Sequence, residues 1–247
     1  MTQPPLSGPQ YLKRGFSLLR EPGIRLFVIL PILVNVLIFG TLSYLTLDKL
    51  GQWIGQVMAW LPQWLSFLEW LLWPLAVILV LVIVMYVFST VANLIAAPFN
   101  GLLSEKVEEM LTGEEVAGRE TILQAIASFP RSIGRECHKL LYYLGFAIVT
   151  LIASFVISPL SPLLWFAMNA WMMAIEYLDY PMDNRGMAFS ESRRRTGSQR
   201  ATSFSFGALV MVGTMIPLLN LIIMPAAVCG GTLMWVERLK DAPAKNA

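Results

Sequence analysis

The sequence predicts an all-α integral membrane protein. The chain has 247 residues, of which 56% are hydrophobic and only 14% are charged, and its mean hydropathy is +0.63. Four stretches contain no Asp, Glu, Lys, Arg or His, namely 26–47, 70–104, 140–175 and 201–236. Soluble proteins carry about one quarter charged residues, so this composition disfavours an ordinary soluble enzyme. Uncharged stretches of this length indicate helices that lie in lipid.

The first stretch, 26–47, is expected to be a transmembrane helix. Its 22 residues would extend about 33 Å as a helix, which is enough to cross a hydrocarbon core of about 30 Å. Pro31 and Asn35 interrupt the stretch one turn apart, and Asn35 would need a polar partner or water. The segment from Leu50 to Leu68 is also uncharged, but its glutamines and tryptophans are typical of a helix that lies in the membrane interface.

The second stretch, 70–104, is expected to be a transmembrane helix that continues beyond the membrane. Its far end contains Asn93, Pro98 and Asn100, and the charged run that begins at Glu105 follows without a break. The sequence therefore predicts one long helix that leaves the membrane and enters the cytoplasm, with Pro98 as a point where it can bend.

The stretches 140–175 and 201–236 are each expected to form a proline-broken helical hairpin. The breaks are expected at the Ser-Pro-Leu-Ser-Pro sequence of 158–162 and at Pro217 and Pro225. The apolar legs are shorter than a membrane span, so each hairpin would be re-entrant, penetrating the bilayer only partly and returning to the same side. The alternative is four tilted spans in a thinned membrane.

The basic residues predict the orientation of this single membrane domain, which covers 1–247. Of the 18 Lys and Arg residues, only Lys49 lies between the first and second stretches. The positive-inside rule therefore places the N-terminus and the C-terminus in the cytoplasm and 48–69 outside, which makes the protein multi-pass. The first apolar stretch is long and begins late, so we expect it to remain as an anchor and not to be a cleaved signal peptide.

The reactive residues of the chain do not indicate an enzyme. The sequence has one histidine, His138, and two cysteines, Cys137 and Cys229, without the spacing of a metal site or of a known catalytic motif. We therefore expect no catalytic residue, no metal and no cofactor. The net charge of +2 is also too small to indicate a nucleic-acid partner.

The most informative short segment is Glu-Pro-Gly-Ile-Arg at 21–25, which places a Pro-Gly turn directly before the first transmembrane helix. Backbone N–H groups and the positive end of the helix dipole favour an oxyanion there, and Arg25 adds a fixed charge. Gly23 would let a ligand approach the backbone closely. The alternative is that Arg25 only anchors the helix at the lipid headgroups.

Several segments resemble one known family. The stretch 10–35 contains Gly-Phe-Ser-Leu-Leu-Arg-Glu-Pro-Gly-Ile-Arg-Leu-Phe, 93–105 reads Asn-Leu-Ile-Ala-Ala-Pro-Phe-Asn-Gly-Leu-Leu-Ser-Glu, and 215–230 begins Met-Ile-Pro-Leu-Leu-Asn. Together with 72–77 and 177–184, these segments are similar, in the same order, to the bacterial CysZ sulfate permeases. The likeness extends over nearly the whole chain.

The resemblance implies a protein of the bacterial inner membrane that imports sulfate for cysteine biosynthesis without an ATPase subunit. It also implies helices that penetrate the bilayer only partly, contact with membrane lipids, and assembly into dimers or larger homo-oligomers. Sulfite and thiosulfate stay open as further substrates, and so does the choice between a channel-like and a proton-coupled mechanism. The alternative function is that of a non-transporting oligomeric membrane scaffold or assembly factor.

The family's glycine-aliphatic-arginine motif binds sulfate through backbone amides and a guanidinium, and it carries over to Gly23, Ile24 and Arg25. Several relatives have a second arginine directly after the first, where this chain has Leu26. The resemblance therefore leaves a two-arginine clamp in doubt, and sulfate would depend more on the amides, on Arg25 and on a basic group from elsewhere.

A path for a divalent anion also requires polar groups along the membrane. The candidates for lining it are the following residues: Asn35, Asn93, Asn100, Glu105, Lys106 and Asn220. Each asparagine has a helix-packing or turn role as its alternative. Glu105 and Lys106 would form a charged ring in an oligomer, or else a solvated helix face, and we expect Glu105 to be salt-bridged because an acidic ring repels sulfate.

Overall fold

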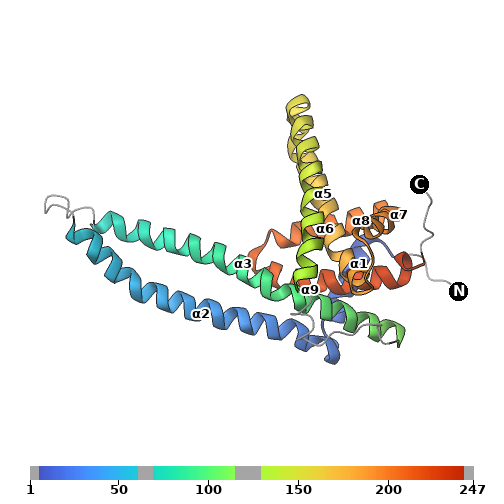
Figure 1. The fold of residues 1–247 in the computed structure, drawn as a ribbon, viewed down its shortest axis with the longest axis horizontal. Coiled ribbons are helices and arrows are strands. Elements are labelled where there is room, and N and C mark those ends of the chain that lie inside the picture. Colours follow the sequence, from blue (N-terminus) through green and yellow to red (C-terminus); the bar gives the residue numbers. More distant parts are fainter. Residues whose placement is uncertain (1–5, 61–68, 115–128, 242–247) are drawn as a thin grey trace. The chain divides into compact units, whose positions relative to one another are not determined.

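The computed structural model describes residues 6–60, 69–114 and 129–241, and all regular structure in these ranges is helical (Figure 1). This confirms the all-α class. By length and composition, three helical segments in the described ranges can cross a membrane: Pro22–Thr46, Gly134–Val156 and Leu219–Leu239. The chain forms two compact units, a smaller one, Ile29–Ala97, and a larger one made of Met1–Val28 and Pro98–Ala247.

Two long helices supply the smaller unit and continue into the larger one. Helix α2 spans Pro22–Ala59 and helix α3 spans Glu69–Thr112, and within the smaller unit they run in opposite directions (Figure 1). No separate helix begins at Leu50, because α2 meets no proline after Pro31 until Pro62 and continues through this segment. The expected helix of this segment is therefore part of α2 as far as Ala59, its place in the membrane interface stays a prediction, and 61–68 lie outside the described residues.

The core of the larger unit is a bundle of four helices. These are α1 (Gly8–Leu18), α6 (Ser161–Asn184), α8 (Arg200–Thr214) and α9 (Pro217–Met234). Glycines let them approach closely: a Cβ on Gly15 would lie 2.1 Å from the carbonyl oxygen of Ala226, and one on Gly207 would lie 2.1 Å from that of Ala170. Tyr11, Phe206 and the side chains around them are therefore completely buried.

The stretch 140–175 lies in a pair of helices that is longer than the sequence indicates. Helix α5 spans Phe129–Val156 and is joined to α6 by a 3₁₀ turn, η2 (Ser158–Leu160), at the proline-rich segment where a break was expected. Both helices extend past the uncharged stretch because their charged ends pair with each other and with α7 (Phe189–Ser198). The apolar side chains at the tip of this hairpin are exposed, and Phe155 has 81% of its surface accessible.

The stretch 201–236 has one break and not two. Helix α8 ends at Thr214 and α9 begins at Pro217, but Pro225 lies inside α9 and does not end it. Around Pro225 the small residues of α9 pack tightly against α1 and α6, as the contact between Ala226 and Gly15 shows. This packing outweighs the local preference of proline. Helix α9 then passes into a short π-helical turn, η3 (Trp235–Leu239).

Candidate anion-binding site

The start of α2 is held in place by one buried side chain and several hydrogen bonds. Ile24 is completely buried in the core of the larger unit. The N–H groups of Ile24 and Arg25 both donate to the carbonyl oxygen of Glu21, at 3.0 and 3.2 Å. No backbone carbonyl in the described ranges accepts the N–H of Gly23. Gly23 is therefore the residue whose amide is available at the positive end of α2.

Arg25 is exposed at the same turn. Its Nε donates to the carbonyl oxygen of Arg20 at 2.7 Å, which fixes the base of the guanidinium against the turn between α1 and α2. No carboxylate of the described residues forms a salt bridge with Arg25. The remaining donors of its guanidinium can therefore reach a ligand from solvent. Leu26, the next residue, is 65% exposed.

A cavity of about 260 Å³ lies against Gly23. Its lining consists of the following residues: Glu21, Pro22, Gly23, Ile24, Lys106, Glu109 and Met110. A Cβ on Gly23 would lie 3.7 Å from Cε of Lys106, so the lysine faces the glycine across this space. Drug-sized ligands fill about 300 to 1,000 Å³, and a smaller cavity that contains a lysine and a free amide suits a small anion.

The cavity contains charges of both signs. Nζ of Lys106 donates to Oε2 of Glu109 at 3.0 Å, and both side chains are partly exposed. Glu21 adds a second carboxylate to the lining. The lining therefore carries a net charge of about −1, and Arg25, which lies beside the cavity, and the positive end of α2 offset it.

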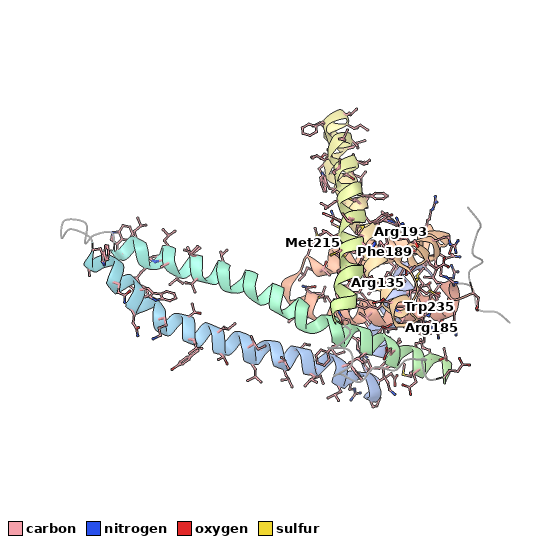
Figure 2. All side chains as sticks on the ribbon, viewed as in Figure 1. Arg135, Arg185, Phe189, Arg193, Met215 and Trp235 are labelled. Atoms are coloured by element: carbon pink, nitrogen blue, oxygen red, sulfur yellow. The ribbon has the colours of Figure 1, made fainter. Side chains whose placement is uncertain are left out.

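The opposite face of α3 is fixed to the bundle. Oε1 of Glu108 accepts hydrogen bonds from Nε and Nη2 of Arg185, at 2.9 and 2.6 Å, and from Nε1 of Trp235 at 3.1 Å. Figure 2 labels the two donors, Arg185 and Trp235, in the larger unit. Ser104 and Thr232 share a buried hydrogen bond of 2.8 Å. These contacts fix the rotation of α3 about its axis, and that rotation directs Lys106 and Glu109 toward the start of α2.

Among the expected path residues whose side chains the structure describes, Lys106 is the one that lies against Gly23. The side chains of Asn35 and Asn93 lie outside the described part of the structure. Asn100 is buried, and its Nδ2 donates to the hydroxyl oxygen of Tyr180 at 3.3 Å, so it joins α3 to α6. Glu105 is partly buried on α3. Asn220 lies in the first turn of α9, and its buried Oδ1 has no partner among the described residues.

A second group of charges, which the sequence analysis did not identify, joins α5 to α6. Arg135 binds Asp179 through two hydrogen bonds of 2.5 and 2.8 Å, and Lys139 lies 3.3 Å from the same carboxylate and 3.0 Å from Glu176. Asp179 has only 2% of its side chain exposed. Burial alone would raise the pKa of Asp179, but the hydrogen bonds from Arg135 and the charge of Lys139 outweigh burial and lower it.

The larger charged set does not form a metal centre in the ranges that the structure describes. No group of three or more His, Cys, Asp and Glu side chains is placed there to hold a metal ion. The ring of His138 forms a hydrogen bond within its own helix, because Nδ1 lies 2.8 Å from the carbonyl oxygen of Gly134. Within this part of the chain, the arrangement that suits a ligand is the cavity at Gly23 and Lys106.

Two comparisons with known proteins agree with each other. The model of a family described as "Sulfate transporter CysZ/Etoposide-induced protein 2.4" matches residues 11–225. A protein of Pectobacterium atrosepticum named "Sulfate transporter CysZ" is 45% identical over 241 residues, which is 96% of this chain and 87% of that protein. Both matches include the 21–25 segment and the end of α3. The chain therefore belongs to the sulfate transporter CysZ/etoposide-induced protein 2.4 family.

Proposed function

We propose that this protein transports sulfate across a membrane and captures the anion at the start of α2. The observation that carries the proposal is the cavity beside the free N–H of Gly23, with Lys106 on its far wall. A helix N-terminus with an unpaired N–H and a nearby guanidinium is a favourable site for an oxyanion. The similar protein of Pectobacterium atrosepticum, which carries the name of a sulfate transporter, supports sulfate as the oxyanion.

The roles of the three motif residues differ. Gly23 would donate its N–H and leave room for the anion, and Arg25 would supply charge and further donors from the exposed side of the turn. Ile24 would not touch sulfate, because its side chain is buried in the core and its N–H donates to Glu21. Its role would be to hold Gly23 and Arg25 at the correct place on the larger unit.

The wider setting follows from the same proposal. Sulfate would enter the cytoplasm across the bacterial inner membrane and supply cysteine biosynthesis without ATP hydrolysis, as the resemblance to the CysZ sulfate permeases implies. The distribution of basic residues supports cytoplasmic termini. The exposed apolar tip of the α5–α6 hairpin supports contact with lipid or with a second copy of the chain in a homo-oligomer.

Uptake of radiolabelled sulfate into sealed liposomes tests this function. We expect the wild-type protein to conduct sulfate and Arg25→Ala to lose about tenfold to a hundredfold of the flux, because it removes charge-assisted hydrogen bonds to the anion. Arg200→Ala is the matched control, since Arg200 is an exposed arginine at the start of α8. Each variant should show the same thermal unfolding midpoint in detergent as the wild type.

The possible results separate the alternatives. Equal flux through Arg25→Ala and the wild type would preserve transport but refute the capture site. No flux through the wild-type protein in well-sealed liposomes would refute transport and favour the scaffold function instead.

A further inference from the structure

We infer that Lys106 is the second cation of the anion site and that Glu109 is its exchangeable partner, occupying Lys106 when no anion is bound. This inference rests on the proposed function, because it assigns further residues to the same site. The residue after Arg25 is an exposed leucine, Leu26, which supplies no charge, and the lysine that lines the cavity comes from α3.

The position of Lys106 supports this role. The Cε atom that carries its ammonium group lies 3.7 Å from the point where a Cβ of Gly23 would be, so the side chain reaches the same space as the free N–H of Gly23. An anion between them would meet a donor from α2 and a donor from α3. The rotation of α3 is fixed from behind by Glu108 and Ser104, so Lys106 does not have to be reoriented by the ligand.

Glu109 is the group that an incoming anion would replace at Lys106. A lysine ammonium has three N–H donors, and one of them is taken by the carboxylate of Glu109 at 3.0 Å. A carboxylate and sulfate are both oxyanions and compete for the same kind of donor. The side chains of Lys106 and Glu109 are 33% and 28% exposed, so water and a small anion can reach this pair. Sulfate would therefore displace Glu109 from Lys106 as it enters.

This arrangement explains why a site for a divalent anion contains acidic residues. With Lys106 paired to Glu109, and with Arg25 offsetting Glu21, the charges of the site sum to about zero when no anion is bound, and the site costs little to solvate. When the carboxylate of Glu109 turns away to water, Lys106 becomes available, and Lys106 and Arg25 supply the two positive charges next to the bound sulfate. The same carboxylate then returns as the anion leaves, which favours release and keeps the affinity moderate, as conduction requires.

Four variants test the inference: Lys106→Met, Glu109→Gln, the combination of both, and Lys13→Met as a matched control. Lys13 is an exposed lysine on α1, outside the cavity lining, and its loss changes the net charge by the same amount. The affinity for radiolabelled sulfate is measured by equilibrium binding to the purified protein, and flux is measured in liposomes. The thermal unfolding midpoint of each variant reports on the fold.

We expect Lys106→Met to weaken sulfate binding about tenfold and Glu109→Gln to tighten it about threefold to tenfold, while Lys13→Met binds like the wild type. In the Lys106→Met background, Glu109→Gln should no longer tighten binding, because the competition is for Lys106. Lys106→Arg should retain most of the affinity, since it retains the charge.

Two results would overturn the inference and leave the proposed function intact. One is sulfate affinity of Lys106→Met equal to that of Lys13→Met. The other is tightening by Glu109→Gln that persists without Lys106, since that would show a general effect of negative charge. If Lys106→Met does not fold, the single variant Glu109→Gln still tests the exchange. A sulfate affinity equal to that of the wild type would refute it. A wild-type protein that neither binds nor conducts sulfate refutes the proposed function itself.

Discussion

The larger unit contains two groups of charged residues that are built differently. In the network between α5 and α6, Arg135, Lys139 and Asp179 are almost completely buried, and each has several protein partners. In the cavity at the start of α2, Lys106 and Glu109 are partly exposed and share one hydrogen bond of 3.0 Å. These three residues of the first group are shielded from solvent, and the second group is open to it.

The difference indicates what each group can do. A buried ion pair with all its hydrogen bonds made cannot release a partner without leaving a charge unpaired in a medium of low polarity. A partly exposed pair can exchange its partner for water or for another ion at little cost. The α5–α6 network therefore suits a role in the stability of the fold, and the cavity has the exchangeable ion pair that the proposed function requires.

The largest effect is expected from Asp179→Ala. This change leaves Arg135 and Lys139 buried without the carboxylate that they share, and we expect a loss of about 3 to 5 kcal/mol in the free energy of unfolding. Thermal or denaturant unfolding in detergent, followed by tryptophan fluorescence, measures it.

Asp183→Ala is the matched control for this change. Asp183 lies on the same helix and contacts Arg135 at 3.0 Å, but its side chain is 41% exposed. We expect it to cost no more than about 1 kcal/mol. Equal destabilisation by the two variants would show that burial does not distinguish the network, and the comparison between the two groups would fail.

A smaller effect is expected from Glu108→Ala, because Glu108 is buried like the first group but its partner is partly exposed like the second. It is completely buried, yet its Oε2 has no partner among the described residues, and Arg185 is partly exposed and can be hydrated. We expect a loss of about 1 to 3 kcal/mol of stability. Weaker sulfate binding should accompany it, because the turn of α3 that carries Lys106 is released. Unfolding and equilibrium binding of radiolabelled sulfate measure the two effects.

The control for this variant is Glu114→Ala. Glu114 follows α3 and is exposed, so its loss should change neither quantity. Sulfate affinity that is unchanged in a destabilised Glu108→Ala protein would show that Lys106 does not depend on the contacts behind α3.

The helices could be predicted from the sequence where local signals dominate. The uncharged stretches indicate apolar helices, and the prolines of 158–162 mark the turn between α5 and α6. The same signal misleads at Pro225, where close packing of small residues holds α9 together. Helix α1 was not predicted, although Ser7 and Gln10 form the hydrogen bond of a capping box and Tyr11 begins a buried face. Tyr11, Leu12 and Gly15 also follow the helical period on one buried face, so the sequence carried a signal that could have revealed this helix.

Some residues of the candidate site could likewise be identified from local sequence signals, and others could not. Gly23 and Arg25 could be identified because a helix start is a local feature, and the sequence shows it directly. The sequence suggested a basic group from elsewhere but could not identify it, because Lys106 reaches Gly23 only through the packing of α3 against the bundle. The pairing of Arg135 with Asp179 has the same origin. Charges at the two ends of an uncharged hairpin are expected to meet, and this signal could have revealed it.

The smallest effect on the fold is expected from Gly23→Ala, which changes the open site without disturbing its surroundings. The new Cβ would lie 3.7 Å from Cε of Lys106, which is an ordinary contact distance, and it would occupy space beside the free N–H. We expect sulfate binding to weaken about threefold to tenfold, the equivalent of one lost hydrogen bond, while the unfolding midpoint stays the same or rises slightly. Equilibrium binding and thermal unfolding provide the two measurements.

Gly134→Ala is the control for Gly23→Ala, because Gly134 is also a helical glycine and a Cβ there would meet nothing within 4 Å. Both changes make the same gain in helix preference, so a difference between them in sulfate affinity can come only from the space at the start of α2. If both variants bind sulfate like the wild type, the anion does not approach the backbone at Gly23. The open pair of Lys106 and Glu109 would then be a surface ion pair beside an unused cavity, and openness alone would not indicate a binding site in this unit.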